Sequence, residues 1–469
     1  MENRNRNLLK NSVVFMVGNF SSKLLMFFLL PLYTNYLDPA EYGQVDIYIN
    51  IMAVLYCFVS LQAIESVFRF IQDAATEDQK QTVITNSLIT AVAGTAVFAL
   101  VMGIFSALTG FEYALIFILY VTTQILAQFC QQTIRGLNKS VLYSAVGIIS
   151  TVVQVGFNVL FIVICHIGAD ALLWSHVLTF VVIIGIILWR CNLIRYIKLK
   201  KISWTVMKEQ LRYSLPLMPN ALCLWGIGSL GRYLLLFFYS TAEVGLFAFA
   251  TKFSQLLGVV NSIFFMAWQQ SAISEYLSKD RDAFATSIFN KFARFQLCAI
   301  AVILPLVKLL TFTIMGDDYR QAWMYVPIFF AGVMFNGYAN FVSMGFFGAK
   351  KTSTVFVASF VAIGLYFVIG YFGAKHYYIW GVGGAYAVSQ FAYYLIMHIR
   401  VRKYMNIRLS YSAVAVPLLM VVASCVCYYW IADKWFQLIP AAVLVLMSLY
   451  LNQALIKKII GTLLPKLKK

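Results

Sequence analysis

The chain alternates between long apolar runs and short polar segments, and this alternation limits its fold more than any other feature. A helix needs about 20 residues to cross the hydrocarbon core of a bilayer. Backbone polar groups in that core must be hydrogen-bonded within the protein, which favours helices over open strands. The sequence therefore predicts an all-α polytopic membrane protein with about 14 transmembrane helices. The predicted spans are 13–34, 45–68, 83–108, 113–134, 141–166, 171–189, 213–239, 245–275, 292–314, 324–348, 353–373, 381–399, 412–431 and 437–456.

Composition excludes a soluble fold. Hydrophobic residues make up 61% of the 469 residues and charged residues 12%, against about 25% charged residues in soluble domains. The spans leave only short loops and no room for an extramembrane catalytic domain, so we expect a transporter and not an enzyme. The eight cysteines lie mostly inside apolar runs without paired spacing. We therefore expect neither a disulfide framework nor a metal site.

The distribution of basic residues predicts the orientation in the membrane. Cytoplasmic loops of membrane proteins are enriched in lysine and arginine. If the N-terminus is cytoplasmic, the loops on that side carry most of the 36 basic residues, and the outer loops hold only Arg320, Lys375 and Lys434. We therefore predict that both termini are cytoplasmic. The same bias explains the net charge of +18 and requires no nucleic acid as a partner.

The longest predicted cytoplasmic loop joins the sixth and seventh spans and is strongly basic. It contains Arg190, Arg195, Lys198, Lys200 and Lys201. Basic segments next to spans bind anionic lipid headgroups. We expect this loop to be a hinge between two halves of the protein that rests on membrane lipids.

Two short repeats indicate that the chain is built from two similar halves. Ala-Glu-x-Gly occurs at 40–43 and again at 242–245, and Gly-Leu-Asn-Lys-Ser at 136–140 is echoed by Gly-Ala-Lys-Lys-Thr at 348–352. Both repeats pair a span with the span six further on, which predicts two six-helix lobes in the same orientation. Such halves usually enclose a transporter's substrate path. The predicted organisation is an N-lobe at 1–190, a basic cytoplasmic linker at 191–212, a C-lobe at 213–399, and two further spans with a basic tail at 400–469.

Three basic residues inside spans are candidates for a cationic lumen. Lys23 lies near the middle of the first span, and Arg232 and Lys252 lie about 10 to 12 Å from the outer side, counted at 1.5 Å per residue. Ionisable groups at such depth are costly unless they face water or a partner. Asn19 shares the face of Lys23. Extension of the side chains to the outer headgroups is the alternative for Arg232 and Lys252, and we expect it for Lys308.

Amides and acids mark further candidate positions within the spans. Gln255 and Ser262 continue a polar stripe from Lys252, and a second stripe, near the fourth span, consists of Gln124, Gln128, Gln131 and Arg135. These stripes predict a polar cavity wall, with an interhelical hydrogen-bond network as the alternative.

Asp46 and Glu65 are the acids within the second span and the candidates for ion coupling. The alternatives are a helix N-terminal cap for Asp46 and an ion pair with Arg69 for Glu65.

Nine short segments distributed along the chain carry a family resemblance. They are LLKNS at 8–12, GNFSSK at 18–23, LPLYT at 30–34, YLDPAEYG at 36–43, GRY at 231–233, VGLFAFATK at 244–252, AW at 267–268, GDDY at 316–319 and GVGGA at 381–385. In these segments the sequence resembles the bacterial polysaccharide repeat-unit flippases of the Wzx type, which belong to the multidrug/oligosaccharidyl-lipid/polysaccharide (MOP) exporter superfamily. The resemblance covers essentially the whole chain. Members often have an aspartate before the arginine of the seventh span, where this chain has Gly231.

The resemblance implies alternating access by two lobes and export of an undecaprenyl-diphosphate-linked oligosaccharide from the inner to the outer leaflet of the bacterial cytoplasmic (inner) membrane. It implies membrane lipids and other polysaccharide assembly proteins as partners. Lysine and arginine pair with phosphate, and amides pair with hydroxyl groups. The sequence contains no ATP-binding loop, so we expect no cofactor. The energy would come from a proton or sodium gradient, the membrane potential or the substrate gradient.

Three other functions compete with this one. A peptidoglycan lipid-precursor flippase shares the same chemistry. A multidrug exporter of the same superfamily would favour acidic or aromatic walls for cationic drugs, whereas the deep charges here are mainly basic. A membrane polysaccharide polymerase or ligase would be expected to carry a large outer loop, and the outer loops here are short.

Overall fold

The regular elements in the described part of the chain are all helices. A computed structural model describes residues 29–274, 278–349 and 353–453. The first-lobe and linker helices are α2 (Leu30–Tyr36), α3 (Pro39–Ser60), α4 (Ala63–Asp73), α5 (Glu77–Thr109), α6 (Ala114–Gly136), α7 (Ser140–Asn158), the π-helical turn η1 (Val159–Ile164), α8 (Asp170–Cys191), the short helices η2 (Leu193–Tyr196) and η3 (Leu199–Lys201), α9 (Trp204–Ser214) and η4 (Leu215–Leu217). The later helices are α10 (Met218–Phe238), α11 (Thr241–Ser274), α12 (Arg281–Ile314), η5 (Asp317–Tyr325), α13 (Val326–Gly348), α14 (Ser353–Val401), α15 (Tyr411–Trp430), η6 (Trp435–Gln437) and α16 (Leu438–Leu451).

This architecture confirms an all-α polytopic membrane protein. Within the described ranges, ten helices are long and apolar enough to cross a bilayer, or eleven if the bent pair α9 and α10 forms one span. Helices occupy each predicted span from the second to the fourteenth, and the helix at the fourteenth, α16, is shorter than the others. The first predicted span, 13–34, lies almost entirely outside the described residues.

Two breaks correct or refine the predicted spans. The second span was expected to be continuous over 45–68, but α3 ends at Ser60 and α4 begins at Ala63, because Leu61 and Gln62 both have left-handed backbone conformations. The break within α14 falls at Tyr378, which has a φ of +59°. It divides α14 into two helices that match the predicted spans 353–373 and 381–399.

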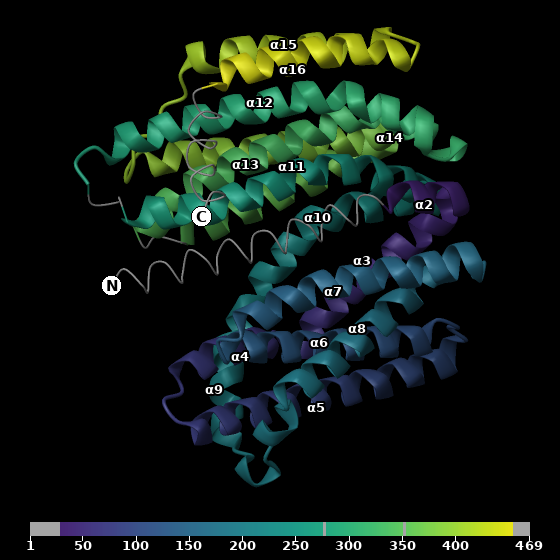
Figure 1. The fold of residues 1–469 in the computed structure, drawn as a ribbon, viewed down its shortest axis with the longest axis vertical. Coiled ribbons are helices and arrows are strands. Elements are labelled where there is room, and N and C mark those ends of the chain that lie inside the picture. Colours follow the sequence, from purple (N-terminus) through teal and green to yellow (C-terminus); the bar gives the residue numbers. More distant parts are fainter. Residues whose placement is uncertain (1–28, 275–277, 350–352, 454–469) are drawn as a thin grey trace, which may run out of the picture. The chain divides into compact units, whose positions relative to one another are not determined.

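The chain packs as two compact units, residues 1–229 and 230–469, which we call unit 1 and unit 2. The boundary falls inside α10, so the first part of α10 packs with unit 1. Within unit 1, α6 contacts α4, α5 and α8, and α9 lies on α4 and α5 (Figure 1). Within unit 2, α13 packs between α11 and α14, and α15 and α16 pack on α12. The lobe boundaries expected at 190, 213 and 399 stay predictions.

Three loops predicted to be cytoplasmic meet at one end of unit 1. The Gln72 amide donates a hydrogen bond to the carbonyl of Gly136 (2.9 Å). The Asn86 amide donates to the carbonyl of Lys201 (2.9 Å), and Gln210 donates to α5. These contacts join the segments that follow α4, α6 and α8. The predicted topology places these three segments on the cytoplasmic side of the membrane. Loops on the same side should lie together, so these contacts are consistent with that topology.

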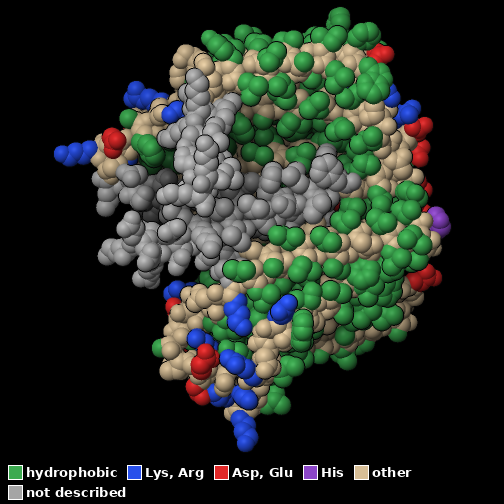
Figure 2. All heavy atoms as spheres, viewed as in Figure 1, with side chains coloured by type: hydrophobic (Ala, Val, Ile, Leu, Met, Phe, Trp, Pro, Cys, Tyr) green, Lys and Arg blue, Asp and Glu red, His purple; other side chains and the backbone are tan. Residues whose placement is uncertain are grey.

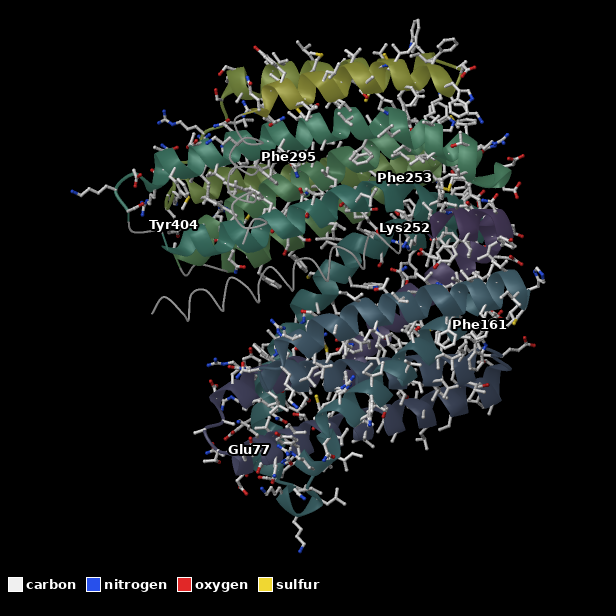
Figure 3. The ribbon with its side chains drawn as sticks, viewed as in Figure 1. Glu77, Phe161, Lys252, Phe253, Phe295 and Tyr404 are labelled. Atoms are coloured by element: carbon white, nitrogen blue, oxygen red, sulfur yellow. The ribbon has the colours of Figure 1, made fainter. Side chains whose placement is uncertain are left out.

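The opposite end of unit 1 gathers the segments predicted to lie outside. The rings of Tyr48 and Tyr113 are 4.9 Å apart between centroids, and the Asn158 amide donates to the Tyr33 hydroxyl (2.8 Å). Glu77, in the first turn of α5, and Phe161, in η1, lie at opposite ends of this unit (Figure 3).

Unit 2 shows the same grouping of loops. At one end, the Thr286 and Asn290 side chains hydrogen-bond to the backbone of the segment 406–410. At the other end, the Tyr325 ring lies 6.2 Å from that of Tyr378 and 5.5 Å from that of Trp380. Tyrosine and tryptophan are enriched where membrane proteins meet the headgroup layer. The second end is the one predicted to be external.

The orientation can be tested by thiol labelling in intact cells, after replacement of the native cysteines. Cysteines introduced at Glu41, Glu243 or Asp317 should react with an impermeant reagent, because these residues belong to the predicted external ends. Cysteines at Leu199 or Asp280 should react only after the membrane is opened. Labelling at Leu199 in intact cells would contradict the predicted orientation.

Candidate functional site

Arg232 and Lys252 are the two predicted lumen cations in the described part of the chain, whereas Lys23 and Asn19 lie outside it. Arg232 on α10 is only 6% exposed, and its guanidinium carbon is 5.5 Å from the centroid of the Phe247 ring on α11. Lys252 lies on α11 (Figure 3). It is half-buried, and it follows Phe247 by about one and a half helical turns. Both cations therefore belong to adjacent helices of unit 2.

The glycine that precedes Arg232 is closely packed. A Cβ atom at Gly231 would lie 2.6 Å from the Tyr366 hydroxyl, 2.7 Å from Val382 and 2.8 Å from Phe247. Real Cβ atoms do not come this close to their neighbours, so a side chain here would require these neighbouring side chains to shift. The aspartate common at this place in the resembled family would need the same shift.

The two described side chains of the polar stripe on α11 differ in their surroundings: one is exposed, and the other forms a hydrogen bond within its own helix. Gln255 is exposed, and Ser262 donates to the carbonyl of Val259 in its own helix (2.7 Å). The roles of Gln255 and Ser262 as a cavity wall stay predictions. The neighbouring Asn261 is buried and accepts a hydrogen bond from Gln296 on α12 (2.5 Å).

Sequence reasoning missed a set of partly and fully buried amides in unit 2. Asn340 donates to Asn336, and Asn336 donates to Gln390 on α14, both at 2.9 Å. Gly337 leaves room for the Asn261 and Gln296 pair, because a Cβ there would lie 2.6 Å from the Gln296 amide nitrogen. Amides between helices stabilise membrane bundles. The signal was present, since each amide interrupts an apolar run.

The predicted stripe on α6 lies on a partly exposed face. Gln124, Gln128 and Gln131 are all half-buried, and the Arg135 guanidinium carbon is 4.3 Å from the centroid of the Phe68 ring. These positions share one face of α6, as predicted. Their role in a cavity wall stays a prediction.

The ion pair with Arg69 that was the alternative for Glu65 does not form. Glu65 accepts a hydrogen bond from Gln132 on α6 (3.1 Å), while Arg69 pairs with Asp73 (3.3 Å). Glu65 lies in the first turn of α4, where a negative charge is favoured by the helix dipole. The pairing joins α4 to α6 and could not be read from local spacing.

The helix cap that was the alternative for Asp46 is also not formed by this residue. Asp38 caps α3 by accepting from the Glu41 N–H (2.8 Å), and Asp46 is buried two turns further along. The Asn50 amide donates to the Asp46 carbonyl (2.7 Å). The Asn50 side-chain oxygen accepts from Ser229 on α10 (2.7 Å). Asp46 therefore stands beside a polar contact between α3 and α10 within unit 1.

Lys308 does not extend to the headgroups as expected. It is buried, and its ammonium group donates to the carbonyls of Tyr428 (2.7 Å) and Ile431 (2.8 Å). It also lies 4.2 Å from the centroid of the Trp323 ring. The two carbonyls belong to the end of α15, where the helix itself supplies no donor. Lys308 is therefore a capping residue for α15.

These features define a class: a polytopic helical membrane protein with cations and amides inside its helical units. The chain belongs to the polysaccharide biosynthesis protein family, whose model matches residues 8–269, more than half of its length. This confirms the family resemblance drawn from the sequence. No curated protein shows significant sequence similarity to the chain.

Solved structures share the fold. The lipid II flippase MurJ in an inward closed conformation has a TM-score of 0.70 at 14% identity, covering 96% of this chain and 100% of that one. An inward-facing multidrug resistance MATE family transporter of the MOP superfamily has a TM-score of 0.64 at 14% identity, covering 81% and 95%. A mutant of the Vibrio cholerae MATE transporter VcmN has a TM-score of 0.57 at 16% identity, covering 85% and 97%.

The capping role of Lys308 predicts a stability defect. Lys308→Met should lower the free energy of unfolding by about 2 kcal/mol, because two buried carbonyls lose a charged donor. The measurement is the thermal unfolding midpoint of the purified protein in detergent. Lys375→Met is the matched control, since Lys375 is exposed. Equal midpoints for the two variants would contradict the capping role.

Proposed function

We propose that this protein is a flippase for an undecaprenyl-diphosphate-linked oligosaccharide repeat unit. It moves the unit from the cytoplasmic to the outer leaflet of the bacterial inner membrane by alternating access. The proposal rests on the family match over residues 8–269, together with a fold that is similar over the whole chain to a lipid II flippase. Other polysaccharide assembly proteins would supply and consume the substrate.

The charges of the described helices suit a diphosphate. Arg232 and Lys252 lie in an apolar helical unit, and ionisable residues inside membrane spans commonly mark substrate pathways. A diphosphate offers several anionic oxygens, and ammonium and guanidinium groups pair with them strongly when water is excluded. Lys23 is the proposed counterpart in the first lobe. The amides Gln124, Gln128, Gln131 and Gln255 offer both donors and acceptors for sugar hydroxyl groups.

A groove on unit 2 suits the lipid part of the substrate. It has a volume of about 820 Å³ and lies between α15 and α16, with Asp433 at one end as the charged residue of its lining. The walls are otherwise apolar, and include Leu419, Ala423, Ile439 and Val443. Apolar chains gain free energy by leaving water for such a surface. We propose that the polyprenyl chain lies along this groove while the headgroup crosses.

Energy coupling is proposed to involve the acids of unit 1. Asp46 is buried and stands beside the Asn50 contact, and Glu65 is hydrogen-bonded to Gln132. A carboxylate inside a membrane helix can bind a proton or a sodium ion as its surroundings change. These two acids are the proposed coupling groups for a proton or sodium gradient.

A peptidoglycan lipid-precursor flippase is the second candidate. The similarity to MurJ favours it, because lipid II is named as the substrate of that protein and the TM-score exceeds that of the MATE transporters. A multidrug exporter is less suited, because Arg232 and Lys252 would repel cationic drugs. The two flippase functions differ in the sugar of the substrate, so the accumulated precursor separates them.

Deletion of the gene tests the proposed function. The cytoplasmic leaflet should accumulate an undecaprenyl-diphosphate oligosaccharide, which can be identified by mass spectrometry of extracted lipids. Cell-surface polysaccharide should fall, and expression of the intact gene should restore it. Accumulation of lipid II instead would establish the second candidate. Unchanged pools of both precursors would contradict a flippase function.

Charge reversal tests the cationic residues. Lys23→Glu, Arg232→Glu and Lys252→Glu should each lower export at least tenfold at normal protein levels, because a carboxylate repels a diphosphate in a medium of low dielectric constant. Lys23→Arg should be largely tolerated. Lys375→Glu is the control in place of the buried Lys308. Normal export by all three reversals would remove these residues from the mechanism.

A further inference from the structure

Unit 1 carries a second apolar groove, on the face formed by α3, α5 and α9. It has a volume of about 650 Å³. Its walls include Leu55 and Phe58 from α3, Ala93 and Val97 from α5, and Trp204 from α9. The groove does not involve the candidate lumen residues. It is therefore a separate feature of unit 1.

The shape of the groove depends on a close contact between α3 and α5. A Cβ atom at Gly94 would lie 2.3 Å from the carbonyl oxygen of Val59, so only glycine lets the two backbones meet here. The groove lining on α5 runs from Ile89 to Val101, a length of about 18 Å at 1.5 Å per residue. That length suits one phospholipid acyl chain and is much shorter than an extended undecaprenyl chain.

One end of the groove is closed by α9. The buried Gln210 fixes this helix to α5 by donating to the Ser87 hydroxyl (2.8 Å) and to the Val83 carbonyl (3.3 Å). Trp204, Met207 and Leu211 follow at intervals of three and four residues, so they share the face that lines the groove. Trp204 is 70% exposed. An exposed tryptophan on a short amphipathic helix is typical of the headgroup layer.

The same helix presents cations next to the groove. Lys208 and Arg212 are exposed, and Lys208 follows Trp204 by one turn of α9. Within the described ranges neither residue forms an ion pair, whereas Lys201 of η3 is paired with Asp78. Figure 2 shows Lys and Arg side chains gathered over this end of unit 1. The groove thus has apolar walls and, at the end formed by α9, a basic rim consisting of Lys208 and Arg212.

We infer that this groove is the binding site of one anionic phospholipid. An acyl chain would lie between α3 and α5, and the headgroup phosphate would meet Lys208 and Arg212. The charge on the rim favours an anionic headgroup, because lysine and arginine near a membrane surface are attracted to anionic lipids. The bound lipid would hold α9 and the basic linker at a fixed depth. The inference does not depend on which substrate the protein carries.

The test uses the purified full-length protein in detergent with one equivalent of added lipid. Native mass spectrometry should show phosphatidylglycerol bound in preference to phosphatidylcholine with the same chains. Ala93→Trp, which fills the groove, should lower bound phosphatidylglycerol at least fivefold. Ala96→Trp is the matched control, because Ala96 is exposed on α5 outside the groove. Equal binding by both variants would overturn the site.

Two further measurements separate the headgroup contact from the chain contact and from misfolding. Lys208→Gln combined with Arg212→Gln should remove the preference for phosphatidylglycerol and leave the binding of phosphatidylcholine unchanged. A photoreactive residue at Ala93 should crosslink to phosphatidylglycerol in the otherwise unaltered protein, and one at Ala96 should not. An unchanged lipid preference in the double variant, or equal crosslinking at the two positions, would contradict the inference. None of these results bears on the proposed transport function.

Discussion

An unpaired polar group inside the hydrocarbon layer costs several kcal/mol, and the packing of unit 2 follows from this cost. Pro305 has no N–H to donate to the carbonyl of Ala301, and the Ser424 hydroxyl on α15 donates to that carbonyl instead (2.7 Å). Lys308 on α12 caps the end of α15, and Lys434, just after α15, donates to Phe312 near the end of α12 (2.8 Å). Side chains on or next to each helix thus hydrogen-bond to backbone carbonyls that the other helix leaves unpaired. These hydrogen bonds fix α15 against α12 in the middle of α15 and at the C-terminal end of α15.

The positions of the helices were predictable because apolar runs of membrane length have few alternatives. Their ends and breaks were less so. The α5 helix begins at Glu77, before the predicted run at 83, because Thr76 and Gln79 form a capping box outside the apolar segment. The break at Leu61 and Gln62 carries no glycine or proline, so no local signal announces it. A hydroxyl group of Ser60 accepts from the Gln62 N–H (3.2 Å) and helps to satisfy the backbone there. Local hydrogen bonds outside the apolar periodicity therefore set the start of α5 and accompany the break between α3 and α4.

The sequence predicted which residues belong to the candidate site, but it did not predict the hydrogen-bond partners of those residues. The depth of Arg232 and Lys252 follows from counting residues along a span, and the structure finds Arg232 buried. The partners of Glu65 and Lys308 lie 67 and at least 120 residues away. Local spacing favoured Arg69 as the partner of Glu65 and the headgroup layer as the surroundings of the Lys308 ammonium group. Partner choice in a bundle depends on which helices pack together, and neither hydropathy nor charge alternation specifies that packing.

The two units hold their described acids at different kinds of position. An aspartate in place of Gly231, as in many members of the resembled family, would require the Tyr366 and Val382 side chains to shift. The described acids of unit 2 lie at or beside helix ends: Glu243, Asp280, Asp282, Asp317, Asp318 and Asp433. In unit 1, by contrast, Asp46 is buried within α3. Under the proposed function, the cations of unit 2 would meet the anionic headgroup of the substrate, and the acid within α3 would bind the coupling ion. The two proposed roles would then fall on different units of the chain.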